Sequence, residues 1–217
     1  MALKRNMKIQ EMLDFLDNEL LPQSRLEIQS WIKPKKRQGG YFVVVRQILC
    51  MVDFLGAVSA GYPLTERKKD PNGQHIAGTK KAINFILNFF EPNKTYQKGV
   101  VENLYNMYRH GLVHLYQPRI LKLSNRTKLM WFFYKGKRQN KSLTVDTSMG
   151  KITFKDVEHL QVITSDRLGG RKYLAVSINC LYDDFEKAVI KYRNKLQNTI
   201  YLQRNWRTTV NAICKPR

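Results

Sequence analysis

The sequence predicts an α+β protein, in which an antiparallel helical bundle is followed by a small basic extension with strands and one long helix. Before residue 120, apolar residues recur at helical spacing in several segments. After Pro118 the chain changes to short aromatic or alternating segments that are separated by basic turns, which is typical of strands. We therefore expect a helical domain over residues 1–120 and a β-containing extension over residues 121–217.

Two helices are predicted near the N-terminus. Apolar residues from Ile9 to Leu21 follow helical spacing, and Pro22 is expected to end this helix. A shorter helix is expected around Leu26 to Ile32.

Three further helices complete the predicted bundle. The segment from about Tyr41 to Ala60 is apolar on nearly all sides, so it is predicted to be the central buried helix. Helical spacing resumes from Thr79 to Phe90. A last helix starts near Tyr96 and is closed by Pro118, because the residue before a proline is pushed out of helical geometry.

The extension is predicted to begin with a β-hairpin. The segment 128–134 is aromatic and short, a polar turn follows, and the segment 142–147 alternates apolar with polar residues. Segments 151–154 and 173–178 are expected to continue the sheet. For Trp131, Phe132 and Phe133 two roles are open, sheet core or stacking on bases, and core is expected for at least two of them.

Two helices are predicted within the extension. A short one is expected from Phe154 to Ile163. The long one runs from Asn179 to about Leu196, with apolar residues on one face and Asn179 as its cap.

Net charge is the strongest global signal of the sequence. The chain has 38 Lys or Arg against 17 Asp or Glu, which gives a net charge of +21. Such an excess of cations on a compact protein attracts a polyanion, so nucleic acid is the leading class of partner.

We expect a cytoplasmic protein with no membrane association. The apolar stretch from Tyr41 to Tyr62 is interrupted by Arg46, Gln47 and Asp53, so it is interpreted as a buried helix rather than a membrane span. The N-terminal residues lack an apolar signal core. The three cysteines are widely separated, which fits reduced thiols.

The stretch from Tyr105 to Pro118 contains the side chains best suited to chemistry on a phosphate. Arg109 carries a permanent positive charge and a fork of donors, and His114 can move a proton near neutral pH. Metal-free RNA cleavage requires these two functions. His110 and His114 have the i, i+4 spacing that can hold zinc, but the intervening Glu and a third ligand are missing, so neither a metal nor a cofactor is expected.

This stretch resembles the motif of the HEPN superfamily. Arg109, four residues that begin with the polar His110, and then His114 match the motif, and Tyr116 completes the longer form Arg-x4-His-x-Tyr of HEPN toxins. The resemblance covers about residues 1–120. It implies a metal-independent endoribonuclease of a toxin–antitoxin or defence system, which works as a homodimer with both motifs in one cleft. It also implies that a nucleotidyltransferase-type antitoxin modifies Tyr116.

Asp53 is the candidate for a supporting residue. A carboxylate within so apolar a helix needs a partner, which Arg46 or Arg109 can provide. HEPN domains often have an acidic or polar residue on an earlier helix that supports the motif, and the resemblance assigns this role to Asp53. The alternative is a plain ion pair between Asp53 and Arg46.

The basic turns of the extension are the predicted RNA-binding platform. Residues 119–217 have 21 Lys or Arg against 7 Asp or Glu, a net charge of +14, which leaves +7 for residues 1–118. The residues expected to contact RNA are Lys135, Lys137, Arg138, Arg171 and Lys172.

If Arg109 and His114 are catalytic, the 2′-hydroxyl of the RNA is the nucleophile. His114 acts as general acid or base, Arg109 stabilises charge on the phosphate oxygens, and His110 shares in proton transfer. Two alternatives stay open. Arg109 and His114 can be ordinary structural residues of an inactive RNA-binding protein, or they can bind the phosphate of a mononucleotide.

Overall fold

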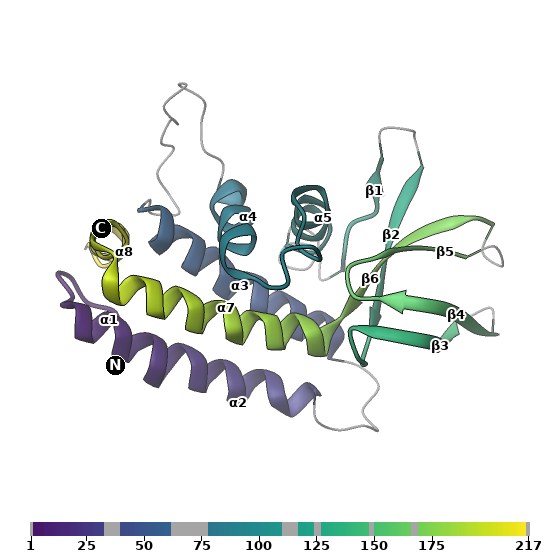
Figure 1. The fold of residues 1–217 in the computed structure, drawn as a ribbon, viewed down its shortest axis with the longest axis horizontal. Coiled ribbons are helices and arrows are strands. Elements are labelled where there is room, and N and C mark those ends of the chain that lie inside the picture. Colours follow the sequence, from purple (N-terminus) through teal and green to yellow (C-terminus); the bar gives the residue numbers. More distant parts are fainter. Residues whose placement is uncertain are drawn as a thin grey trace.

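A computed structural model describes residues 2–32, 40–61, 78–109, 117–123, 127–147, 150–165 and 169–215. It confirms the predicted α+β class: helices make up one end of the molecule and the strands lie at the other (Figure 1). A long helix, α7 (Ile178–Asn198), extends from the strands across the helical part.

The N-terminal helical segment does not end at Pro22, so that prediction was wrong. Helix α1 (Ile9–Phe15) passes through a π-helical turn, η1 (Leu16–Leu20), directly into α2 (Leu21–Ile32). Pro22 is the second residue of α2. The N–H of Leu21 donates to the carbonyl of Leu16, five residues back, so the backbone bonding changes register just before the proline, which has no N–H to donate.

Helix α3 (Tyr41–Ala60) is the central helix, as predicted. It packs against α2, α7 and α8 (Ile200–Ile213), and also against α4 (Gly78–Phe89) and the π-helical turn η2 (Tyr105–Arg109) that follows α5 (Lys98–Leu104). By length and composition α3 also qualifies as a membrane-crossing helix, with a mean hydropathy of 1.8, but half of that segment is buried inside the protein. Buried core helices meet the same criteria.

The strands form two sheets. One has the order β1 (Leu121–Lys122), β2 (Lys128–Tyr134), β6 (Arg171–Ser177), β5 (Val162–Ser165), and its central pair β2–β6 is parallel. The other is the hairpin of β3 (Gln139–Thr147) and β4 (Gly150–Glu158). The predicted hairpin between segments 128–134 and 142–147 was therefore wrong. Strand β2 is apolar on both faces, which suits a central parallel strand that is covered on both sides.

The predicted short helix from Phe154 to Ile163 was also wrong, since this segment ends β4 and begins β5. Its β-branched and aromatic residues favour strands. Asp156 and Leu160 adopt positive φ angles of 49° and 64°, which no right-handed helix allows.

Strand β2 contributes to two hydrophobic cores. Leu129, Trp131 and Phe133 face the helices, whereas Phe132 and Tyr134 face the β3–β4 hairpin in a second, smaller core. This alternation follows from the two-residue period of a strand. Of the three aromatic residues 131–133, which were expected to include at least two core residues, Phe132 is buried, and Trp131 and Phe133 are partly buried and pack against the larger core.

Helices α7 and α8 belong to the same core as the N-terminal helices. The predicted helix from Asn179 is confirmed, but Ser177 caps it, by accepting the N–H of Cys180 at 3.3 Å. On α8, which was not predicted, Trp206 packs on Phe15 and Phe54. The two predicted domains thus share one hydrophobic core.

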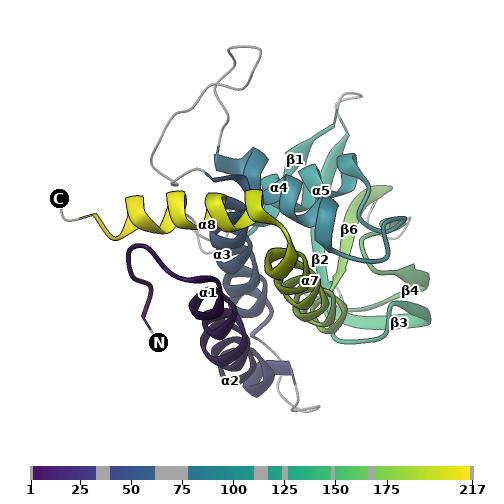
Figure 2. The same cartoon turned by 60° about the vertical axis from the view of Figure 1, so that its left-hand side comes forward.

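The segment before α1 lies beside α8 (Figure 2). The N–H of Asn6 donates to Oδ1 of Asn211 at 2.7 Å, and Arg207 on α8 donates to the carbonyl of Met7 at 3.0 Å. These bonds fix the segment before α1 to the last helix.

A close contact between α3 and α4 yields a stability prediction. A Cβ at Gly56 of α3 would lie 2.8 Å from backbone atoms of Lys81 and Ala82 in α4, so Gly56→Ala must push the two helices apart. We expect it to lower the free energy of unfolding by about 1–3 kcal/mol, measured by urea denaturation. Gly99→Ala in α5 is the matched control: a Cβ there meets no atom within 4 Å. An equal or smaller loss for Gly56→Ala than for Gly99→Ala would contradict the close approach.

Candidate functional site

The π-helical turn η2 positions the arginine of the predicted motif. Its last residue is Arg109, whereas His110, His114 and Tyr116 lie outside the described residues. Tyr108 fixes the turn against the sheet, because its hydroxyl donates to the carbonyl of Leu174 at 3.2 Å and its ring lies 4.9 Å from that of Phe133. Turns of this kind often occur at functional sites.

Arg109 forms an ion pair with Asp53 of the central helix. Its Nε donates to Oδ2 of the carboxylate, and the side chains of Arg109 and Asp53 are 23% and 12% exposed. The predicted supporting carboxylate therefore contacts the predicted catalytic arginine. The Nη1 of Arg109 is buried and has no hydrogen-bond partner within the described ranges. Nε of the guanidinium is thus held by Asp53, and Nη1 is enclosed by the protein without a hydrogen-bond partner among the described residues.

Cys50 lies on the same face of α3 as Arg46 and Asp53. The Cys50 side chain is exposed, but the atoms around it partly desolvate the thiol, and this raises its pKa. The charges of Arg109 and Arg46 act in the opposite direction, and that of Asp53 raises the pKa further. The net shift is upward, so Cys50 is a neutral thiol at pH 7. The same electrostatic coupling shows that both arginines lie near this part of α3.

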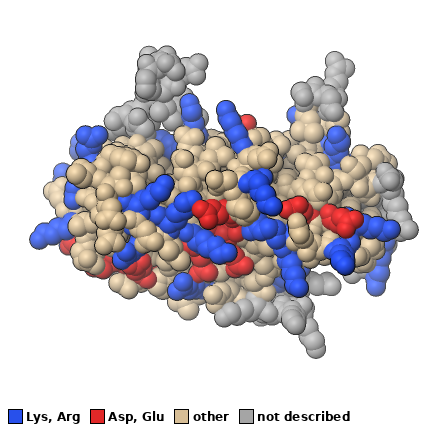
Figure 3. Space-filling model, viewed as in Figure 1, with Lys and Arg blue, Asp and Glu red and all other residues tan. Residues whose placement is uncertain are grey.

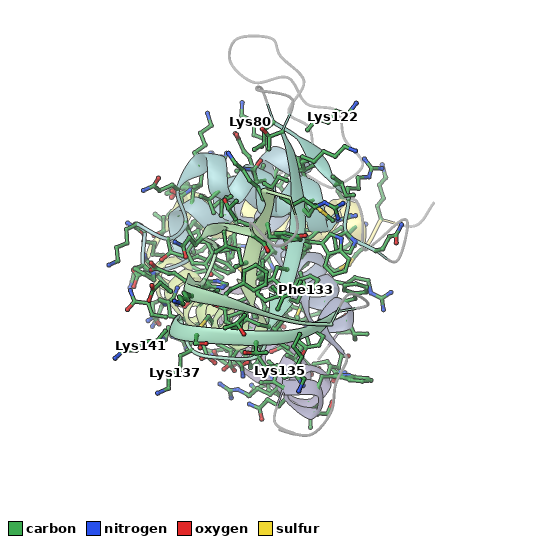
Figure 4. All side chains as sticks on the ribbon, turned by 90° about the vertical axis from the view of Figure 1, so that its right-hand side faces the viewer. Lys80, Lys122, Phe133, Lys135, Lys137 and Lys141 are labelled. Atoms are coloured by element: carbon green, nitrogen blue, oxygen red, sulfur yellow. The ribbon has the colours of Figure 1, made fainter. Side chains whose placement is uncertain are left out.

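The five basic residues expected to bind RNA do not form one surface. Lys135, Lys137 and Arg138 follow the end of β2, whereas Arg171 and Lys172 begin β6. Because β2 and β6 are parallel, these groups lie at opposite ends of the strands, about 20 Å apart for strands of this length. Figure 4 shows Lys135 and Lys137 far from Lys122, which pairs with Lys128 at the other end of β2.

Two of these residues contact the protein itself. Lys135 donates to the carbonyl of Trp31 at 2.7 Å and lies 5.7 Å from the ring centroid of Tyr41. Arg138 donates to both carboxylate oxygens of Asp184, at 2.6 and 2.7 Å. Positive charge is also spread over the helical part of the molecule (Figure 3).

Asp184 is the centre of a buried polar network that the sequence reasoning missed. The hydroxyl of Tyr96 donates to Asp184 at 2.7 Å and lies 3.3 Å from Nε2 of His159. The N–H of Ser177 donates to Nδ1 of His159 at 3.0 Å, which leaves the proton of the neutral ring on Nε2, facing Tyr96. The available signal was the position of Asp184 on the apolar face of α7, beside Leu181 and Phe185.

This network links the sheets to the helices. Asp184 comes from α7, Arg138 from the turn after β2, His159 from the turn after β4, and Tyr96 from the segment before α5. Tyr96, His159 and Asp184 are buried, and the hydroxyl of Tyr96 forms hydrogen bonds with both of the other side chains. We interpret the network as a structural joint, because these three side chains are buried and paired with each other. Within the described residues, Nη1 of Arg138 is the one atom of the four side chains that is buried without a hydrogen-bond partner.

The buried histidine predicts how stability depends on pH. Burial, with a smaller contribution from Arg138, lowers the pKa of His159 to about 3. The unfolded chain binds this proton near pH 6.5 but the folded protein does not, so the free energy of unfolding falls by about 1.4 kcal/mol per pH unit as pH drops below 6. Urea denaturation between pH 6 and pH 5 measures this slope above the range in which carboxylates titrate. It should be absent in His159→Gln, and an unchanged slope in that variant would contradict the assignment.

Among the described residues no metal cluster identifies the site, and no relative identifies it either. Over the described ranges, no group of three His, Cys, Asp or Glu side chains is placed to hold a metal ion. Comparisons of the chain with protein-family models, with curated proteins and with solved structures found no match. The chemistry of Arg109 and its neighbours is therefore the basis for proposing a function.

Proposed function

We propose that the protein is a metal-independent endoribonuclease of HEPN type, with Arg109 and His114 as its catalytic pair. The observation that carries the proposal is the ion pair between Asp53 and Arg109. The motif alone contains no partner for its arginine. The ion pair provides one, because Asp53 lies on a separate helix and holds Arg109 in place. Residues that position a reacting group are most effective when they lie on rigid elements, and α3 is the central helix of the core.

The proposed reaction uses the RNA's own 2′-hydroxyl as nucleophile. This oxygen attacks the adjacent phosphorus, the bond to the 5′-oxygen breaks, and the products have a 2′,3′-cyclic phosphate and a 5′-hydroxyl. The 2′-hydroxyl gives up its proton as it attacks, and the leaving 5′-oxygen takes one up. His114 acts as the general base or the general acid in this exchange, with His110 as the candidate for the other role. Arg109 binds the phosphate and stabilises the charge that develops on its oxygens.

Asp53 has a positioning role in this proposal. By accepting from Nε it fixes the plane of the guanidinium, so the remaining N–H groups point in a set direction. Because the carboxylate neutralises much of the charge of Arg109, attraction of RNA depends on further cations, of which the chain has many. The HEPN resemblance extends the proposal to a cytoplasmic homodimer of a toxin–antitoxin or defence system, with Tyr116 as the residue an antitoxin modifies.

Cleavage in the absence of metal tests the proposal. Purified protein is incubated with tRNA and messenger RNA in EDTA, and the product ends are analysed. Wild type should cleave and leave cyclic phosphate ends. Arg109→Ala and His114→Ala should each lose about 100-fold or more of the rate, and DNA should stay intact because it has no 2′-hydroxyl.

Two matched variants serve as controls for this assay. Arg193→Ala removes the arginine of another partly exposed ion pair, with Asp17 at 3.1 Å, and His75→Ala removes a histidine outside the motif. Both should cleave like wild type. Undiminished cleavage in Arg109→Ala and His114→Ala would reject the catalytic pair. No cleavage by any sample, with salt-sensitive RNA binding intact, would favour the alternative, an inactive RNA-binding protein.

A further inference from the structure

A groove on the outer face of α7 has the chemistry of a nucleic-acid contact. It has a volume of about 640 Å³ and is lined by the second half of α7 and by residues at the end of α4. None of its residues belongs to the Arg109–Asp53 site or to the basic turns of the strands. Lys and Arg side chains lie over this part of the molecule in Figure 3, with a few acidic side chains between them.

Three lysines follow one another along the groove. Lys187, Lys191 and Lys195 are spaced i, i+4, i+8, so they share one face of α7 at intervals of about 6 Å. Lys191 pairs with Glu91 at 2.6 Å, and Nζ of Lys195 lies 5.3 Å from the ring centroid of Phe89. The side chains of Lys191 and Glu91 are 33% and 58% exposed, and an ion pair this accessible to water contributes little stability, so a phosphate can replace Glu91 as the partner of Lys191.

The groove also offers surfaces that suit unpaired bases. Ile190 lies in the groove and is 45% exposed, and the amides of Asn194 and Asn198 can bond base edges. The groove ends at Thr199, and two residues further Tyr201, which is 59% exposed, is available for stacking. Proteins that bind single strands without sequence preference combine cations that contact the nucleic-acid backbone with aromatic side chains that stack on the bases.

We propose that this groove binds single-stranded RNA through Lys187, Lys191 and Lys195, with Tyr201 stacking on a base. The groove is a second contact surface, separate from the site of cleavage. The inference that the single strand is RNA rather than DNA rests on the proposed function. The inference that the groove binds a single strand does not depend on that function. An anionic membrane is the less favoured partner, because the main apolar stripe of α7 faces the protein core and the basic face is hollowed.

The test is the affinity for a labelled RNA oligonucleotide that the protein cannot cleave. An oligonucleotide with 2′-O-methyl groups lacks the nucleophile, so its fluorescence anisotropy measures binding alone. The full chain with Lys187→Ala and Lys195→Ala should bind about tenfold or more weakly, and the slope of log affinity against log salt should fall by about 1.4. Tyr201→Ala should weaken binding and leave that slope unchanged.

A charge-matched control variant distinguishes RNA binding in the groove from attraction by the overall positive charge of the protein. Lys151→Ala with Lys155→Ala removes two exposed lysines from β4, and this variant should bind like wild type. Equal losses in the two double variants would overturn the proposal. So would a groove variant that binds RNA normally but loses binding to phosphatidylcholine vesicles containing phosphatidylserine.

These experiments distinguish failure of the groove proposal from failure of the ribonuclease proposal. Loss of oligonucleotide binding in the groove variant, with no cleavage of natural RNA by wild type, supports the groove and rejects the ribonuclease. Cleavage by wild type together with unchanged oligonucleotide binding in the groove variant rejects the groove alone.

Discussion

The parallel pairing of β2 with β6 is the constraint on which the rest of the structure depends. Both strands are apolar on both faces, so helices must cover one face and the β3–β4 hairpin the other. Strand β6 ends at Ser177 and α7 begins at the next residue, so this pairing directs α7 back across the helices. Helices α7 and α8 then complete the core around α3. The helical part therefore depends on residues from both ends of the chain.

Two polar contacts link the layers at different points. The network around Asp184 joins α7 to the turns that follow β2 and β4, and its Tyr96, His159 and Asp184 side chains are buried and paired with one another. The turn η2 joins the sheet to α3, because Tyr108 bonds the backbone of β6 and Arg109 pairs with Asp53. The arginine proposed for catalysis thus lies where two rigid elements meet. That placement suits a residue that must hold a phosphate in one orientation.

Periodicity and local chemistry predicted the helices better than the sheet. The central position of α3 followed from its apolar composition, and the need of Asp53 for a partner followed from the cost of burying a charge. The pairing of β2 with β6 was not predictable, because a strand pattern does not name its partner some forty residues away. Pro22 was misinterpreted, since a π-helical turn before a proline has no clear sequence signal. The role of Asp184 depends on Tyr96 and His159, which only the fold brings near it.

A double-mutant cycle on cleavage tests most directly whether Asp53 acts through Arg109. The rates of RNA cleavage in EDTA are compared for wild type, Asp53→Asn, Arg109→Lys and the variant with both changes. We expect the double variant to lose no more than Arg109→Lys alone, because Asp53 has nothing left to position once the guanidinium is gone. Losses that multiply would show that the two residues act independently. No cleavage by wild type would contradict the catalytic role of Arg109 itself.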